Sequence, residues 1–351
     1  MNSATKQRES NIELLRLLAM MLVIVTHIDG NSLGYPMPED YLINHSSVFL
    51  RLLFASLSAV CVDLFILISG WFGIYPNKRK FFSFIYQCLF FSLSMYVIAC
   101  IVGKASFTPY QLFRNCILID YWFIPAYIGL YVLAPVMNSF VEQSNKKQFT
   151  CIVVGLFILE LLYGWKFETA GFNSGYSIIH FLLLYLIARY LRKYTFQLIK
   201  LPAGCDVLIF LLLSLLSTIL GMLYLKNGRG EFEYYYLFED HSSPITILAA
   251  IFLFLAFTKI RIGYNKVINY LASSAFAIYL FHQHPTAIPK FKTITNSLFY
   301  NNDLLSYSYK IVCFIIGVSL IAILIDQIRI YSWKLIQYII NGNKCHNTSL
   351  Q

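Results

Sequence analysis

Charged residues are scarce in this chain, and their scarcity excludes an ordinary soluble protein. Asp, Glu, Lys and Arg make up 13% of the 351 residues, whereas a soluble domain contains about 25%. Hydrophobic residues make up 58% of the chain, and the mean hydropathy is +0.63. A core of this size cannot bury so much apolar surface without lipid. The composition therefore predicts a polytopic membrane protein, with residues 1–351 forming one integral membrane domain.

Cysteine pairs at metal-binding or redox spacing are also missing. The eight cysteines are scattered, mostly within apolar runs, and no CxxC pair occurs, which argues against a disulfide framework or a zinc site. His282 and His284 have no carboxylate or cysteine cluster beside them, so we expect no metal. The net charge of +10 does not indicate nucleic acid, because the basic residues lie in short loops between apolar stretches.

Apolar windows bounded by charge, Pro or Gly predict an all-α membrane bundle. The first window lacks a cleavage site and contains Glu13 and Arg16, so we interpret it as a retained helix rather than a signal peptide. Most lysines and arginines fall in alternate loops, which places both termini on the cytoplasmic side of the cell (inner) membrane. The ten predicted transmembrane helices cover residues 11–30, 47–74, 81–102, 117–138, 149–165, 176–191, 206–225, 243–259, 267–285 and 307–328.

Arg16 and His27 lie eleven residues apart in the first predicted helix. At about 100° per residue, eleven steps complete about three turns, so both side chains share one face. The helical rise separates them by about 16 Å. A cation in a membrane helix costs about 2.5–3.5 kcal/mol on insertion scales, so such residues usually face a polar interior. With Glu13 and Asp29 nearby, we interpret this face as catalytic; an interfacial histidine bonded to a neighbouring helix is the alternative.

A second polar cluster lies in the next predicted helix, at CVDLFILISGWFG (61–73). Asp63 and Ser69 interrupt an otherwise apolar run, and the Ser69-Gly70 pair allows a close helix approach or a local break. A basic triplet follows, which suits anionic lipid, topology anchoring or the phosphates of a cofactor. The triplet consists of Lys78, Arg79 and Lys80.

A third cluster is DYWFIPAYIGLYVLAPVMN (120–138), which we predict to be a span interrupted by Pro125 and Pro135. Prolines free backbone carbonyls, and membrane proteins tolerate this where helices pack or line a cavity. Trp122 either lines such a cavity or belongs to an interfacial aromatic belt. His282 lies at the outer end of the ninth predicted helix.

The predicted outer loop 226–242 is rich in tyrosine and acidic residues. Such side chains can stack on sugars and hydrogen-bond to their hydroxyls. They also form interfacial tyrosine belts with solvated charge. We expect the interfacial role here, with sugar binding as the alternative.

The order of the motifs resembles the acyltransferase-3 family over about residues 8–332. Members of this family are bacterial multi-pass membrane O-acyltransferases that modify cell-surface polysaccharides with an acyl group, usually acetyl, from cytoplasmic acyl-CoA. The closing helix around IDQIRI (325–330) fits as well. The four motifs that carry the resemblance are Arg16-x₁₀-His27, FILISG (65–70), YWFIPAYIGLYVLAP (121–135) and IYLFHQHP (278–285).

The resemblance implies acetyl-CoA or another acyl-CoA as donor, no tightly bound cofactor, and a polysaccharide or lipid-linked glycan as acceptor. His27 and Arg16 correspond to the family's essential histidine and arginine. His27 would act as a general base or form an acyl-histidine, and Arg16 would hold the CoA or neutralise a carboxylate. The candidate partners of the CoA phosphates are Lys78, Arg79 and Lys80. The candidates for lining the substrate channel are Glu13, Asp29, Asp63, Ser69, Tyr121, Trp122 and His282.

A transporter or flippase for a polyprenyl-linked sugar is the main alternative, because it also needs aromatic cavities and buried Arg and His. Transporters often show a two-fold internal repeat, and none is visible in this sequence. A polysaccharide polymerase or ligase would place its catalytic residues in a large outer loop. The ionisable residues here lie in predicted helices, which argues against a polymerase or ligase. The resemblance therefore decides the prediction, which is an acyltransferase.

Overall fold

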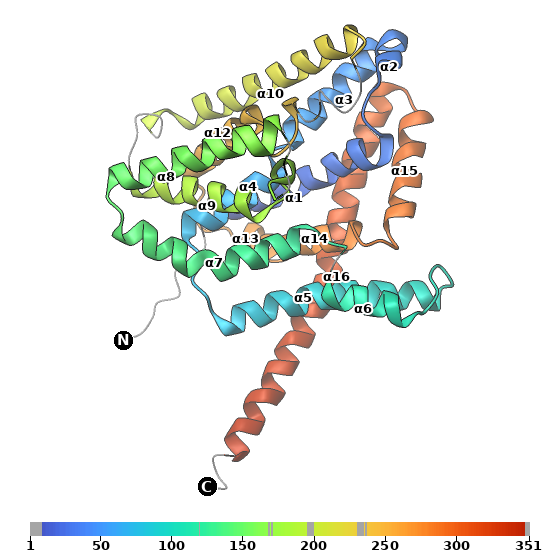
Figure 1. The fold of residues 1–351 in the computed structure, drawn as a ribbon. Helices are drawn as coiled ribbons and strands as arrows, with labels where there is room; N and C mark the ends of the chain where they lie inside the picture. The colour runs from blue at the N-terminus through green and yellow to red at the C-terminus, as the bar shows by residue number, and fades with distance from the viewer. Residues whose placement is uncertain are drawn as a thin grey trace.

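The computed structural model describes residues 9–118, 120–167, 169, 171–194, 200–229, 235 and 237–347, with side chains up to residue 340 (Figure 1). Helix accounts for 81% of the structure, and no strand occurs in the described residues. The predicted all-α class is therefore confirmed.

The chain folds into long helices joined by short turns, with π-helical turns at η1 and η2 and a 3₁₀ turn at η3. In chain order the elements are α1 (Ser10–Thr26), η1 (His27–Leu33), α2 (Pro38–Ile43), α3 (His45–Ser58), α4 (Cys61–Phe72), α5 (Lys78–Ile101), α6 (Pro109–Ile117), α7 (Phe123–Gln143), α8 (Lys146–Leu159), η2 (Glu160–Lys166), η3 (Asn173–Gly175), α9 (Ile178–Lys193), α10 (Ala203–Lys226), α12 (Pro244–Lys259), α13 (Lys266–Ala272), α14 (Ala275–His282), α15 (Ile288–Tyr300) and α16 (Leu304–Asn347).

Seven helical segments of the described chain are long and apolar enough to cross a bilayer. Each of the ten predicted stretches overlaps a helix, but the count of ten spans and the side on which the termini lie stay predictions. The seven segments are Ser10–Leu33, His45–Phe72, Lys78–Ile101, Phe123–Gln143, Lys146–Lys166, Ala203–Lys226 and Leu304–Ile340.

Three predicted spans differ from the structure in their continuity. The second, 47–74, is divided into α3 and α4 at Ala59 and Val60. α7 runs unbroken through Pro135, so the predicted proline interruption is wrong. Pro125 lies in the first turn of α7, where its missing N–H costs no helical hydrogen bond. The ninth predicted span is instead divided into α13 and α14 at Ser273 and Ser274.

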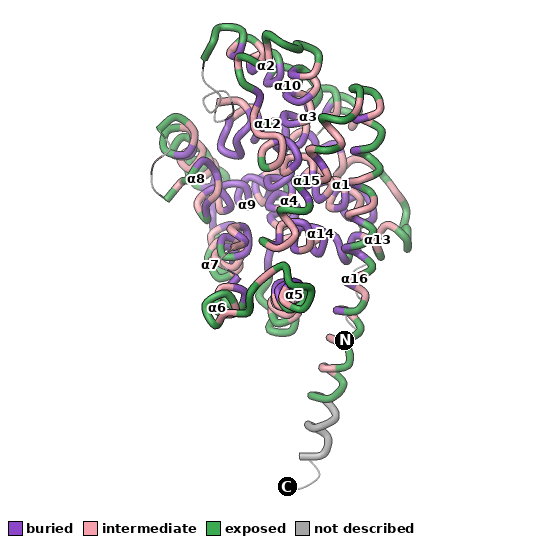
Figure 2. The backbone as a smooth tube through the Cα atoms, turned by 90° about the vertical axis from the view of Figure 1, so that its right-hand side faces the viewer, coloured by how far each residue is buried: buried purple, intermediate pink, exposed green. Residues whose placement is uncertain are grey.

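The buried centre of the molecule is formed by α1, α4, α9 and α14, around which the other helices pack (Figure 2). α4 packs closely on α9, because Gly70 has no side chain: a Cβ atom there would lie 2.6 Å from the carbonyl oxygen of Tyr185. Of the two roles predicted for the Ser69-Gly70 pair, the structure has the close approach, since α4 is continuous through both residues.

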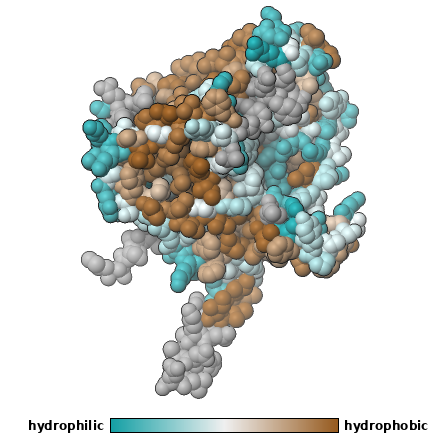
Figure 3. Space-filling view, viewed as in Figure 1, coloured by the Kyte–Doolittle hydropathy of each residue, from teal (hydrophilic) through white to brown (hydrophobic). Residues whose placement is uncertain are grey.

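The outer surface of the bundle is apolar along the helices and hydrophilic toward their ends (Figure 3). α10 shows this most clearly, since a row of its aliphatic side chains is exposed. A row of this kind needs lipid rather than water beside it. Its members are Leu208, Leu211, Leu212, Leu215, Leu216, Ile219 and Leu223.

Candidate active site

His27 lies where α1 widens into the π-helical turn η1, a local form often found at functional sites. Its Nδ1 atom is 2.9 Å from Nε2 of His282 in α14, and the two ring centroids are 5.1 Å apart. Two histidines that are 255 positions apart in the chain therefore form a hydrogen-bonded pair.

The hydrogen bonds of the pair settle which nitrogens carry protons. Nδ1 of His282 faces the carbonyl oxygen of Ile278, and a carbonyl only accepts, so His282 Nδ1 must donate. The Nε2 atom of neutral His282 is then an acceptor, and Nδ1 of His27 donates to it. This leaves a lone pair on Nε2 of His27, which has no partner among the described residues.

His27 lines a cavity of about 240 Å³, which we call the His27 cavity. The walls come from α1, η1, α4, α7, α14 and the segment around residues 235–241. Aromatic side chains form much of these walls. The lining side chains include Thr26, Tyr35, Phe65, Trp122, Phe123, Tyr176, Tyr235, His241 and Phe276.

The second half of loop 226–242, as far as the structure describes it, folds into the protein, whereas residues 226–229 are exposed. Tyr235, Glu239, Asp240 and His241 are all buried. The Tyr235 hydroxyl is 3.1 Å from the Tyr176 hydroxyl, and both rings line the His27 cavity. The predicted interfacial belt with solvated charge is therefore wrong for these four residues, because burial removes them from water.

His241 is the second histidine of the His27 cavity. Its Nδ1 donates to the carbonyl oxygen of Ala59 over 3.2 Å, and its ring centroid lies 4.9 Å from that of Tyr176. Burial lowers the pKa of His241 to about 4, so the imidazole is neutral at physiological pH.

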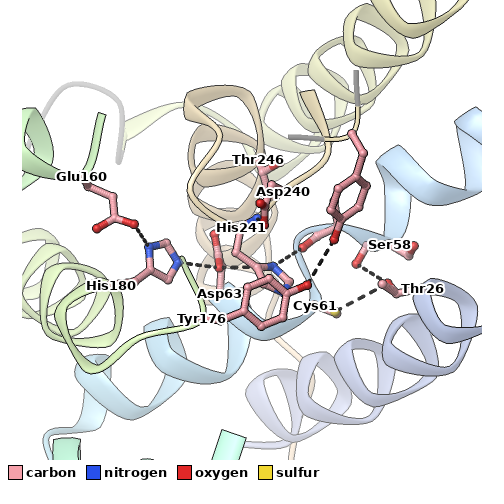
Figure 4. Close-up of polar contacts among 12 residues, drawn as sticks. Thr26, Ser58, Cys61, Asp63, Glu160, Tyr176, His180, Asp240, His241 and Thr246 are labelled. Carbon is pink, nitrogen blue, oxygen red and sulfur yellow. Dashed lines mark hydrogen bonds and ion pairs between the residues drawn. The ribbon is translucent and has the colours of Figure 1, made fainter. Parts of the chain in front are cut away.

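A fully buried charged chain lies behind His241 (Figure 4). His180 places Nε2 3.1 Å from Asp63 Oδ1 and Nδ1 3.1 Å from Glu160 Oε1. A neutral imidazole has only one N–H to donate, so two carboxylate partners favour the imidazolium form. Asp63 also lies 4.0 Å from Nδ1 of His241, which is too far for a hydrogen bond.

Arg16 lines two further cavities, of about 390 Å³ and about 270 Å³. Its guanidinium pairs with Glu13 on the same helix. We call the larger space the Arg16 cavity, and Lys80 lines it as well. The smaller space, the connecting cavity, shares Arg16 and Ser69 with the Arg16 cavity.

The connecting cavity also adjoins the His27 cavity. Phe65, Phe123 and Phe276 line both of these spaces. A series of cavities therefore runs from Lys80 past Arg16 to His27, with an aromatic wall before the histidine.

A protein-family model described as an acyltransferase domain matches residues 9–326. The chain belongs to the acyltransferase-3 family. No curated protein and no solved structure matches the chain. Family membership and the apolar helices together identify a multi-pass membrane acyltransferase.

Several predicted site residues of this acyltransferase line the cavities. Trp122 and His27 line the His27 cavity, while Arg16, Ser69 and Lys80 line the Arg16 cavity. His282 does not line the His27 cavity, but it is hydrogen-bonded to His27, which does. The structure therefore brings together candidates that the sequence left on four separate helices.

Other predicted residues lie away from these cavities. Asp29 pairs with Arg51 over 3.1 Å, Nε to Oδ1, and ties η1 to α3. The Tyr121 hydroxyl donates to the carbonyl of Leu280 over 2.9 Å. Lys78 and Arg79 are exposed beside Lys80 rather than in the cavity. Glu13 and Asp63 are buried ion-pair partners that line none of the three cavities.

Three buried groups of the acyltransferase were missed by the sequence analysis. Glu160, His180 and His241 belong to different segments and share no motif spacing. Glu160 and His180 were detectable from the sequence, because an ionisable residue inside an apolar stretch has an unfavourable free energy of membrane insertion. His241 gave no such signal, because it lies in a polar loop. Within the described residues, no cluster of three metal-ligating side chains occurs.

Proposed function

We propose that the chain is a membrane O-acyltransferase that moves an acetyl group from acetyl-CoA to a hydroxyl of a surface polysaccharide or lipid-linked glycan. The observation that carries the proposal is the free lone pair of His27 Nε2, in a cavity that continues toward Arg16 and Lys80. The family supports the acyl transfer.

In the proposed reaction His27 is the general base. Nε2 takes the proton of the acceptor hydroxyl while its oxygen attacks the thioester carbonyl carbon. The carbon–sulfur bond then breaks, and the thiolate takes the same proton back from Nε2. The products are the acetyl ester and free CoA, and His27 returns to its starting state. The His282 acceptor keeps Nδ1 of His27 protonated throughout.

The donor would enter from the end of the bundle where Lys80 lies. Lys80 and Arg16 line the Arg16 cavity and supply positive charge for the anionic groups of CoA. Lys78 and Arg79 add positive charge at the exposed edge beside Lys80. The thioester then reaches His27 through the connecting cavity. We place this entry on the cytoplasmic side of the cell membrane, in line with the loop charges.

Radiolabelled acetyl-CoA and membranes that contain the protein test this proposal. We expect wild type to label the cell-envelope glycan, and His27→Ala to lower the rate by at least about 100-fold, the usual contribution of a general base. His45→Ala is the matched control, because His45 is an exposed histidine that lines none of the three cavities.

Retained transfer in folded His27→Ala would contradict the assignment of His27. Absence of labelled glycan with wild type, together with movement of lipid-linked sugar across the membrane that is independent of His27, would favour the transporter instead. The amount of folded protein, measured by size-exclusion chromatography, normalises each rate.

A further inference from the structure

His241 is held by the protein on one side of its ring only. Nδ1 is fixed to the Ala59 carbonyl, and the backbone N–H of His241 donates to Asp240 Oδ1 over 2.7 Å. Because Nδ1 donates, Nε2 carries a lone pair. The residue is 3% exposed, and Nε2 has no partner within the described part of the chain.

The lone pair of His241 Nε2 is free to accept a hydrogen bond from a molecule beside it, either water or a ligand. The imidazole lines the His27 cavity. A ligand hydroxyl there can supply the missing hydrogen.

Two imidazoles, each with a lone pair on Nε2 that no described residue uses, therefore line one cavity. Nε2 of His27 and Nε2 of His241 can each accept one hydrogen bond, and neither can donate in this tautomer. A ligand that satisfies both needs two O–H donors. The cavity of about 240 Å³ has room for about eight waters at about 30 Å³ each, which is enough for one sugar ring.

The wall around His241 suits the faces of such a ring. Trp122 lies with its ring centroid 6.2 Å from His241 and 4.5 Å from Tyr176. Flat apolar faces next to polar edges are the usual features of a specific small-molecule site.

We propose that His241 recognises the acceptor substrate, and that the His27 cavity binds a vicinal diol of one sugar ring. One hydroxyl gives its proton to His27 Nε2 and becomes acylated, while its neighbour donates a hydrogen bond to His241 Nε2. This inference rests on the proposed function and names the part of the site that selects the acceptor.

The pKa of His241 agrees with this role. Burial lowers it to about 4, so the nitrogen remains an acceptor at the pH of the cell. In a protonated imidazole Nε2 would be a donor, so it could not accept a hydrogen bond from the ligand hydroxyl.

Substitutions at His241 can separate the role of its Nδ1 donor from the role of its Nε2 acceptor. In His241→Asn the amide nitrogen can still donate to Ala59, but no acceptor remains at the position of Nε2. In His241→Gln the longer side chain returns an amide oxygen to that position. We compare two rates for each protein: acetyl transfer to envelope glycan, and hydrolysis of acetyl-CoA by water without glycan.

The ratio of transfer to hydrolysis is the decisive quantity. We expect His241→Asn to lower this ratio by about tenfold, the effect of one hydrogen bond, and His241→Gln to restore part of it. Equal loss of both rates in His241→Asn would overturn the acceptor role and leave His241 a structural residue. Absence of any His27-dependent acetyl-CoA consumption by wild type would overturn the proposed function itself.

A second measurement uses the wild-type protein alone, so it does not depend on the folding of a variant. Cyclohexanol and cis-1,2-cyclohexanediol serve as surrogate acceptors, and the acetyl ester formed from each is measured. We expect the diol to react about tenfold faster, well beyond the twofold advantage of a second hydroxyl. A preference of twofold or less would contradict the diol site.

Discussion

At the scale of single residues, the carbonyl of Ile278 sets the tautomer of His27, the proposed base, through two successive hydrogen bonds. It accepts from Nδ1 of His282, which makes Nε2 of His282 the acceptor for His27. His27 is thereby held in the tautomer with a lone pair on Nε2. In hydrolases a carboxylate commonly holds the base in this way. Here a neutral imidazole does so, which adds no charge to a buried site.

This arrangement makes His282 a positioning residue, and substitutions can test it. His282→Leu removes the acceptor, so His27 loses its fixed tautomer and ring orientation. We expect transfer to fall by about 100-fold. His282→Gln returns an amide oxygen near the position of Nε2 and should recover a large part of the rate. Both rates are measured as labelled glycan per amount of folded protein.

His284 offers the matched control, two residues away in the chain. It is as buried as His282, but it bonds to Thr286 and Asn115 and has no contact with His27. His284→Leu should therefore cost folded protein rather than rate per folded molecule. If His282→Leu and His284→Leu lower the normalised rate equally, or if His282→Gln recovers nothing, His282 has only a structural role.

At the scale of helices, the close packing of α4 on α9 fixes the position of Ser69, which lines the Arg16 cavity. A methyl group at Gly70 would lie 2.6 Å from the Tyr185 carbonyl oxygen and 2.9 Å from Cβ of Ala188. Both of these atoms belong to the helix itself and cannot swing aside. The two helices would have to separate.

Gly70→Ala should therefore destabilise the protein by about 1–3 kcal/mol, the usual cost of overpacking. We expect a lower apparent melting temperature in detergent. Gly155→Ala in α8 is the control, because a Cβ there has no heavy atom within 4 Å. An alanine gains helix propensity over glycine, so Gly155→Ala should melt at or above wild type. Equal melting of the two variants would contradict the close-packing argument.

The sequence predicts best the helices whose apolar run has the length needed to cross the lipid bilayer. α5 and α10, for example, begin and end within a few residues of their predicted spans. The break between α13 and α14 is set instead by local geometry at Ser273 and Ser274. Hydropathy averages over such a break and cannot detect it. The opposite error occurs at Pro135, where the sequence predicts a break and α7 is continuous. A proline predicts a helix break when the packing around it is unknown.

The candidate site likewise has one part that the sequence predicts and another that it does not. The periodicity of one helix was enough to place Arg16 and His27 on a common face, and both do line connected cavities. The pairing of His27 with His282 spans 255 positions, which no local pattern encodes. His241 enters the cavity only because its loop folds inward, so its role depends on tertiary structure.

At the scale of the whole molecule, the three cavities form a route with different chemistry at its two ends. Positive side chains, Arg16 and Lys80, line one end, and histidines with aromatic rings line the other. Phe65, Phe123 and Phe276 lie between them. In the proposed reaction, a donor with anionic groups and an acceptor with hydroxyls would approach the same thioester from opposite sides of the membrane.

The proposed route predicts that acetyl-CoA works from one face of the membrane only. Acetyl-CoA is charged and does not cross a bilayer, so it must reach Lys80 from the solution on that side. In sealed inverted vesicles, whose cytoplasmic face is outward, we expect added label to enter glycan at least about tenfold faster than in right-side-out vesicles, since only leaky vesicles of the second kind contribute.

Opening both kinds of vesicle with detergent should make the two rates equal, which shows that they contain the same amount of active protein. His27→Ala vesicles of both orientations give the background. Equal rates in sealed vesicles would contradict a one-sided donor route. A preference for right-side-out vesicles would instead place the Lys80 end outside and reverse the predicted orientation of both termini. Because the loop charges and the cavity charges come from different residues, agreement between them in this assay tests the orientation and the route together.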